Sequence, residues 1–111
     1  MKPKGYWIVR LDMQDEGRFA EYAAVVRRIM AENGARFLVR GGRSEVMAGP
    51  THSRVTVIEF PDYDTAVRCS RLPEYLAAKQ RRDEERKAAG MSGAATGDAV
   101  IVEGYESCKS Y

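Results

Sequence analysis

Two hydrophobic periodicities alternate along the chain, and this alternation limits the fold more than any other feature of its 111 residues. Four segments have the two-residue period and the β-branched and aromatic content of strands: residues 5–12, 35–40, 54–60 and 99–105. Helical patterns separate the first segment from the second and the third from the fourth. The second and third segments are joined by a loop alone, which predicts an antiparallel hairpin. The predicted order is therefore β-α-β-β-α-β.

The helical stretches have recognisable beginnings and ends. Asp15 is the expected N-cap of the first helix, and Gly34 stands where a helix ends in a left-handed residue. The second helix is expected to open at Pro61-Asp62, to break at Leu72-Pro73 and to resume as far as about Ala89. After Leu76 the chain is almost entirely polar, and residues 79–87 mix both signs of charge. This pattern predicts an exposed, solvated helix face.

The order of the elements predicts an α+β fold of the ferredoxin-like kind, with helices on one face of a four-stranded antiparallel sheet. Right-handed crossovers place the first and third strands at the centre and the second and fourth at the edges. We expect a single domain over residues 1–111, with a core of about 5–106 and a flexible tail over 107–111. The helix-free face is then expected to carry Ile8, Leu38, Val55, Val57 and Ile101. Because so much apolar surface needs a cover, we expect a homodimer formed sheet to sheet.

The same face is expected to carry ionisable side chains. Strand alternation groups Arg10 with Glu59 and Glu103, and with Tyr6 and Tyr105. We expect Arg10 to hydrogen-bond to Glu59 or Glu103. One interpretation is an ion network that fixes the register of the dimer. The other is a pocket in which Arg10 holds an anion, a glutamate acts as the base and a tyrosine orients the substrate.

A double glycine, Gly41-Gly42, interrupts the second strand and is flanked by Arg40 and Arg43. Glycine tolerates backbone angles that regular strands do not use, so a distortion here is expected to point Arg43 toward the mouth of the pocket. Arg40 is a second candidate ligand-binding residue. Tyr63 and Tyr75 can serve as aromatic walls of a pocket or as ordinary packing residues.

Several functional classes are disfavoured by the sequence. Neither phosphate-binding glycine motif occurs, and one histidine, His52, with two distant cysteines, Cys69 and Cys108, does not form a zinc site. We therefore expect no metal and no cofactor, and Cys69 is expected to be a core residue. The 18 basic and 16 acidic residues give a net charge of +2, and no apolar run approaches a membrane span. We expect no nucleic-acid or membrane partner, no signal peptide and a cytoplasmic location of bacterial type.

The chain resembles the domain-of-unknown-function 1330 family, part of the dimeric α+β barrel superfamily. The resemblance spans about residues 5–106 and rests on short motifs in a specific order: Tyr-Trp-Ile-Val at 6–9, a helix with Phe19 and Tyr22, Gly-Gly-Arg at 41–43, Arg54, Ile-Glu-Phe-Pro at 58–61, Pro-Glu-Tyr at 73–75 and Val-Glu-Gly-Tyr at 102–105. It departs from the family at 69–72, which is more polar, and at 90–97, which is longer.

The resemblance implies a ferredoxin-like protomer and a homodimer whose two sheets form a barrel, with no established activity. Superfamily relatives include cofactor-independent monooxygenases, haem-degrading and chlorite dismutase-like enzymes, and small isomerases or dehydratases. Their pockets lie inside the barrel or between sheet and helices. Three hypotheses remain: a metal-independent enzyme for a small carboxylate or aromatic metabolite, a non-catalytic ligand-binding module, and a structural dimerisation domain.

Overall fold

The structure, a computed structural model, describes residues 2–12, 20–49, 54–90 and 96–105. Its elements are β1 (Gly5–Asp12), α1 (Ala20–Glu32), β2 (Arg36–Arg40), β3 (Arg54–Phe60), α2 (Tyr63–Ser70), α3 (Pro73–Ala88) and β4 (Thr96–Glu103). The predicted features at Asp15, Phe19, His52 and Cys108, and most of the segment 90–97, lie outside the described residues.

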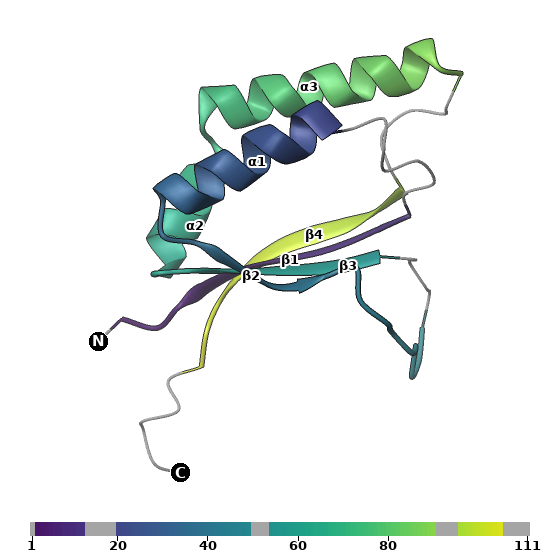
Figure 1. Cartoon of the computed structure of the whole chain (residues 1–111). Helices are drawn as coiled ribbons and strands as arrows, with labels where there is room; N and C mark the ends of the chain where they lie inside the picture. The colour runs from purple at the N-terminus through teal and green to yellow at the C-terminus, as the bar shows by residue number, and fades with distance from the viewer. Residues whose placement is uncertain (1, 13–19, 50–53, 91–95, 106–111) are drawn as a thin grey trace.

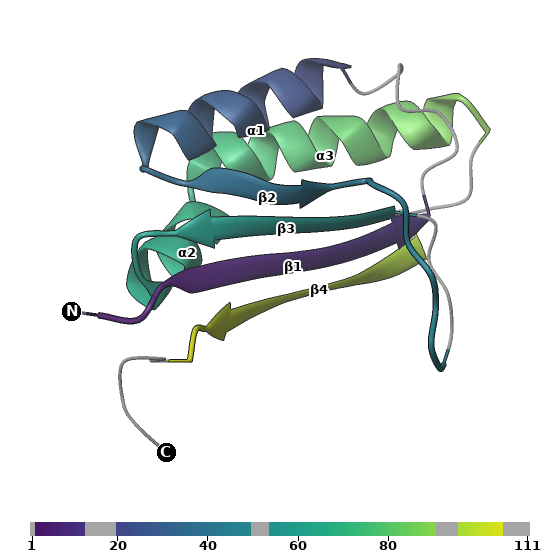
Figure 2. The same cartoon turned by 60° about the horizontal axis from the view of Figure 1, so that its bottom comes forward.

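The four strands form one antiparallel sheet in the order β2-β3-β1-β4, which confirms the predicted central and edge strands. All three helices lie on the same side of the sheet, and among the described residues no helix lies on the other side (Figures 1 and 2). This is the α+β arrangement expected from the sequence. It gives the sheet one covered face and one helix-free face.

The predicted helix boundaries have clear physical causes in the structure. Asp62 caps α2, because its carboxylate accepts a hydrogen bond of 2.7 Å from the backbone N–H of Thr65, and this bond lowers the pKa of Asp62. Leu72 is extended and Pro73 begins α3, which confirms the break before the proline. Gly34 follows α1 with a φ of 70°, as the helix end requires.

The core lies at one end of the sheet, between its covered face and the helices. It consists of residues from β1, β3, α1 and α2: Trp7, Ile29, Met30, Ile58, Phe60, Ala66 and Cys69. The indole N–H of Trp7 donates a 2.9 Å hydrogen bond to the carbonyl of Ala66, which fixes α2 against β1. Cys69 is fully buried, as predicted, and its burial raises the pKa of the thiol.

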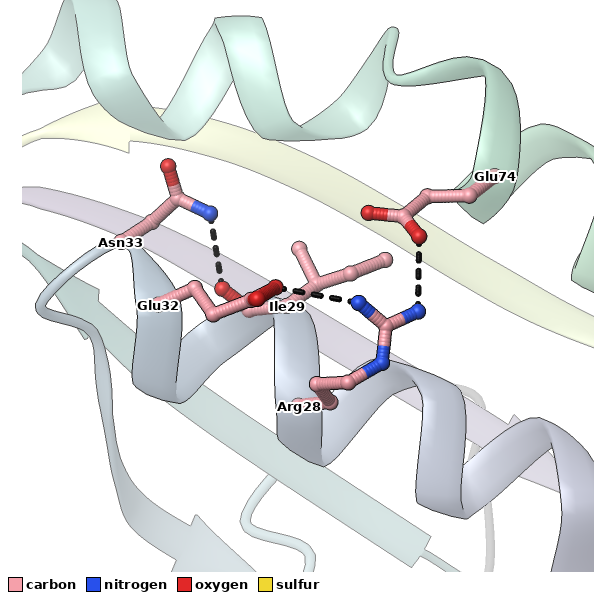
Figure 3. A network of polar contacts seen from close by, with 5 residues as sticks. All are labelled: Arg28, Ile29, Glu32, Asn33 and Glu74. Atoms are coloured by element: carbon pink, nitrogen blue, oxygen red, sulfur yellow. Dashed lines mark hydrogen bonds and ion pairs between the residues drawn. The ribbon is translucent and has the colours of Figure 1, made fainter.

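Helices α1 and α3 run antiparallel and are joined by two ion pairs at their surface. The Arg28 guanidinium donates to Glu74 at 2.6 Å and also to Glu32 at 3.0 Å, as Figure 3 shows. Seven residues earlier on α1 and seven later on α3, Glu21 accepts a 2.9 Å bond from Arg81. These pairs hold the two helices together along their lengths.

Strand β4 starts and faces differently from the prediction. It runs from Thr96 to Glu103, not from Ala99, and Ile101 lies opposite Trp7 on the covered face. Directly opposed residues share a face, so Ile101 and Glu103 belong to the covered side and the helix-free side receives Val100 instead. The prediction was wrong because three consecutive apolar residues do not define which alternate set points inward, and a shift of one residue exchanges the faces.

Strand β2 contains one extra residue. Phe37 lies opposite Ile58, yet Val39 lies opposite the next residue, Val57, so Leu38 is inserted between the two pairs. Val39 therefore faces the helix-free side and Arg40 the covered side, the reverse of strict alternation. The strand ends at Arg40, and no strand follows over residues 41–49.

The polar part of α3 is not wholly exposed, contrary to the prediction. Ala78, Arg82 and Arg86 are buried on the inner face of the helix, in line with Tyr75. Arginine can do this because its long stem covers apolar surface while the guanidinium finds polar contacts. The inner face of α3 thus changes from aromatic to cationic along its length.

Candidate functional site

A cavity of about 560 Å³ lies between the covered face of the sheet and helices α1 and α3. Its floor and walls are mainly apolar and aromatic, and the described residues of this kind are Trp7, Val9, Leu11, Tyr22, Val26, Phe37, Ile58 and Tyr75. We call this cavity the cleft. Its volume falls within the range of about 300–1,000 Å³ typical of small-molecule sites.

The cleft exists because smaller side chains occupy the covered face of the sheet at a distance from the core. Next to the row that contains Trp7 and Ile58, the sheet presents Thr56 and Ala99, and then Gly97. α1 contributes two alanines, Ala20 and Ala23, to the opposite wall. Gly97 cannot be enlarged, because a Cβ there would stand 2.0 Å from the carbonyl oxygen of Arg10. The missing volume is thus encoded by small residues on β3, β4 and α1.

Basic side chains surround this apolar space. Five of them line it, from α1, β2, β3 and α3: Arg27, Arg40, Arg54, Lys79 and Arg82. Only two acidic residues among the described residues line it, Asp83 and Asp98. The excess of positive charge around an apolar floor favours an anion with an apolar body.

The aromatic rings of the cleft continue outward from the core. The ring centroids of Phe60 and Trp7 are 5.1 Å apart, those of Trp7 and Tyr75 are 5.3 Å apart, and those of Tyr75 and Tyr22 are 6.4 Å apart. Burial raises the pKa of Tyr75, and the neighbouring Tyr22 adds to the effect. Tyr75 therefore stays protonated at neutral pH and can donate a hydrogen bond.

The helix-free face has a different arrangement, in three rows that cross the strands. One row contains Arg36, Glu59 and Tyr6, in which Glu59 accepts from Arg36 at 2.9 Å and from the Tyr6 hydroxyl at 3.3 Å. A second row contains Arg10 and Asp98, joined by two hydrogen bonds of 3.0 and 2.7 Å.

Between the two charged rows lies an apolar row that spans all four strands: Val39, Val57, Ile8 and Val100. We call this set the apolar row.

The predicted pairing of Arg10 with Glu59 or Glu103 is wrong. Its partner is Asp98, which lies before the predicted strand of residues 99–105 but within β4. Glu59 does lie on the predicted face, but it pairs with Arg36 in a different row. Glu103 lies opposite Gly5 on the other side of the sheet.

Of the predicted catalytic and ligand-binding residues, Arg40 alone lines the cleft, and its guanidinium lies over the Phe37 ring at 4.7 Å. Tyr6, Arg10 and Glu59 lie across the sheet from it. Arg43 is exposed and does not line the cleft, so the prediction that the double glycine directs it there is wrong.

Gly41 instead ends β2 with a φ of 66° and a backbone N–H bonded to the carbonyl of Val55. Of the predicted tyrosines, Tyr75 lines the cleft, whereas Tyr63 and Tyr105 are exposed.

Sequence reasoning missed most of the basic lining. Arg27, Arg54, Lys79 and Arg82 were not selected as site residues, although all four line the cleft. A signal for Arg82 was present, because Tyr75, Ala78 and Arg82 are spaced as one helix face. A helix face that continues from Tyr75 and Ala78 through a basic residue predicts a buried Arg82.

Two features are absent from the part of the chain that the structure describes. Within those ranges, no group of three or more histidine, cysteine, aspartate or glutamate side chains is placed to hold a metal ion. None of the helices that the structure describes combines the length and apolar character needed to cross a membrane.

Comparison with known proteins gives a family and a fold. The family model described as "Domain of unknown function (DUF1330)" matches residues 4–105. The crystal structure of RPA0582, a protein of unknown function from Rhodopseudomonas palustris, matches with a TM-score of 0.57 and 18% identity, covering 96% of this chain and 85% of that one.

The crystal structure of methylated RPA0582 matches with a TM-score of 0.58 and 17% identity, covering 98% and 86%. A search of curated proteins found no match. At this level of identity, the structural likeness supports the fold alone.

Proposed function

The chain belongs to the DUF1330 family, whose description assigns no activity. From the lining of the cleft, we propose that the protein binds a small organic anion with an aromatic or apolar body. The observation that carries the proposal is the combination of an apolar cavity of about 560 Å³ with five basic side chains around it. A carboxylate attached to an aromatic ring matches both parts. The ring replaces water on the apolar floor, and the carboxylate meets the cationic rim.

The cleft supports binding more strongly than proton transfer. The carboxylates suggested as bases, Glu59 and Glu103, do not line it. Of the two residues that do, Asp98 directs its carboxylate to Arg10 on the helix-free face, and Asp83 contacts Arg82. Both carboxylates are thus engaged with arginines, an arrangement that suits an electrostatic role better than proton transfer.

The test uses Trp7, the single tryptophan of the chain, as an internal reporter, since it lines the cleft. We expect 3-phenylpropionate to change the Trp7 fluorescence saturably, and the uncharged 3-phenylpropanamide, of the same shape, to bind at least about tenfold more weakly. Equal responses to the acid and the amide would contradict recognition of charge. No response to either compound would contradict the binding site itself.

A cavity-filling variant provides the control. Ala99 lies on the cleft wall and is exposed to it, so Ala99→Leu can occupy the space without displacing core atoms. We expect this variant to fold with unchanged or increased stability and to lose the response to 3-phenylpropionate. Retained binding in Ala99→Leu would place the ligand elsewhere on the protein.

We propose in addition that two copies associate through the helix-free face. The support is the apolar row, which crosses all four strands and is flanked on both sides by rows of ion pairs. Val39 and Val100 are 41% and 51% exposed in the single chain, so the row has no cover of its own. An apolar centre with a charged rim is the usual composition of a protein interface.

A second copy is the occupant that this face suits best. The two paired rows give the face both signs of charge in a fixed order, and a two-fold axis through the apolar row would oppose the rows of one copy to those of the other. Light scattering at micromolar concentration should give a mass of about twice 12.4 kDa. A monomer at that concentration would contradict this proposal and leave the cleft proposal unaffected.

A further inference from the structure

Arg82 differs from the exposed arginines Arg28 and Arg10 in how its charge is accommodated. Its side chain is only 9% exposed, yet its carboxylate contact is with its neighbour Asp83, at 3.4 Å from both Nε and Nη2. The exposed pairs Arg28–Glu74 and Arg10–Asp98 close to 2.6 and 2.7 Å. Charge-assisted bonds of this type normally measure about 2.7–2.9 Å. Arg82 is therefore deeply buried in the cleft, yet its carboxylate contact is longer than those of the exposed pairs.

The position of the Arg82 guanidinium is nevertheless fixed by an aromatic side chain of α1. Its guanidinium lies over the Tyr22 ring, 4.4 Å from the centroid. Tyr22 in turn contacts Tyr75, which contacts Trp7 in the core. A series of packed rings thus connects the guanidinium to the centre of the molecule. The cation lies over the face of one ring, and this contact leaves the edge of the guanidinium, where its N–H donors lie, for another acceptor.

We infer that Arg82 binds the anionic group of the ligand directly and that Tyr22 is its positioning residue. This inference rests on the proposed function and narrows the ligand class to carboxylates. A planar guanidinium with parallel donors matches the two oxygens of a carboxylate, and a carboxylate at normal distance replaces the long contact with Asp83. The apolar part of the ligand then lies on the rings next to Tyr22, because the same series of rings lines the cleft.

The test compares two adjacent arginines of α3. Arg82 lines the cleft, whereas Arg81 pairs with Glu21 on the outside and does not line it. We expect Arg82→Gln to weaken 3-phenylpropionate binding about 100-fold and Arg82→Lys about tenfold, because lysine keeps the charge without the planar fork. Arg81→Gln is expected to bind like the wild type. Binding of 3-phenylpropanamide should be the same in all four proteins.

The positioning role of Tyr22 has its own matched pair. Tyr22→Phe keeps the ring under Arg82, and Tyr22→Leu removes it. We expect Tyr22→Phe to bind 3-phenylpropionate within about twofold of the wild type and Tyr22→Leu to bind about tenfold more weakly. Should Arg82→Gln fail to fold, Arg82→Lys and Tyr22→Leu retain a positive charge at residue 82 and provide the same measurement.

The outcomes separate the inference from the proposed function. A wild type that does not distinguish the acid from the amide overturns the proposed function. A wild type that does distinguish them, together with unchanged discrimination in Arg82→Gln, overturns the role of Arg82 and leaves the cleft proposal in place. Equal losses in Tyr22→Phe and Tyr22→Leu overturn the positioning role and assign the effect to the hydroxyl.

Discussion

Arginine side chains are paired with carboxylates in different ways on the two faces of the sheet. On the helix-free face, Arg10 and Arg36 each reach a carboxylate on a neighbouring strand, at 2.7 and 2.9 Å. In the cleft on the other face, Arg82 is far more buried, but its carboxylate contact measures 3.4 Å. The Arg40 guanidinium lies over the Phe37 ring, and among the described residues Arg40 forms no ion pair. Close pairing therefore does not follow burial across this sheet, since the exposed Arg10 and Arg36 are closely paired and the buried Arg82 is not.

The two arrangements suit different kinds of partner. Closely paired charges around an apolar row define a surface with little net charge, which suits contact with a second protein surface. An excess of basic side chains around an apolar cavity gives a net positive potential, which suits a small anion. Maintaining a buried cation without a close partner is unfavourable for stability, and such a cost is typical of binding sites.

The largest expected effect comes from a charge in the apolar row. Val100→Glu leaves the protomer fold intact, since the side chain is half exposed there, but it would bury an unpaired carboxylate between two copies. We expect the dimer dissociation constant to rise about 1,000-fold, measured by sedimentation. Val46→Glu is the control, because Val46 is similarly exposed and follows β2 outside the sheet. Equal dissociation constants for the two variants would contradict an interface at the apolar row.

Two consecutive residues of β3 compare the faces within one strand. Ile58 is 3% exposed under the helices, whereas Val57 lies in the apolar row. We expect Ile58→Ala to lower the free energy of unfolding by about 3 kcal/mol at any protein concentration. Val57→Ala should lower it by about 1 kcal/mol in dilute protein and by more where dimers form. Denaturant unfolding at two protein concentrations measures both effects. If the loss of unfolding free energy in Val57→Ala is the same at both concentrations, an interface at the apolar row is contradicted.

The pair of Arg10 and Asp98 tests whether the charged rows belong to the interface. Arg10→Met leaves Asp98 without this partner, so we expect the dimer dissociation constant to rise about 30-fold. Arg28→Met is the control, because Arg28 pairs with Glu74 on the helix layer. An unchanged constant in Arg10→Met would restrict the interface to the apolar row.

The smallest expected effect is a pH dependence carried by the cleft. Burial raises the pKa of Tyr75 above its ordinary value of 10.0, so the unfolded chain loses this proton before the folded one. The stabilisation is complete below pH 10 and is lost as the pH rises from there toward the higher pKa of the folded state. Tyr75→Phe should therefore flatten the alkaline fall in stability. Tyr63→Phe, which changes an exposed ring, should leave the slope as it is. Parallel curves for all three proteins would show that Tyr75 is not buried in solution.

Much of the fold was predictable because it depends on local pattern. The boundaries of β1 and β3 agree with the sequence, as do the break at Leu72-Pro73 and the core position of Cys69. The strand order followed from the element order and the handedness of crossovers. The cleft was predicted less well. Arg40 and Tyr75 were among the candidates, whereas Arg82, which we regard as its central residue, was assigned to solvent.

What the sequence determined by itself was the set of elements and their order, since periodicity, caps and breakers act over a few residues. Only the tertiary structure decided which alternate residues of β4 face inward, where β2 takes an extra residue, and that an arginine late in α3 is buried. These features depend on neighbours distant in the chain. The register of β4 is defined by pairing with β1, and Arg82 is buried because Tyr22 on α1 packs against its guanidinium. Local pattern carries no information about such partners. The helix-free face with its ion pairs and the cleft with its basic lining are therefore distinguished only by the tertiary structure.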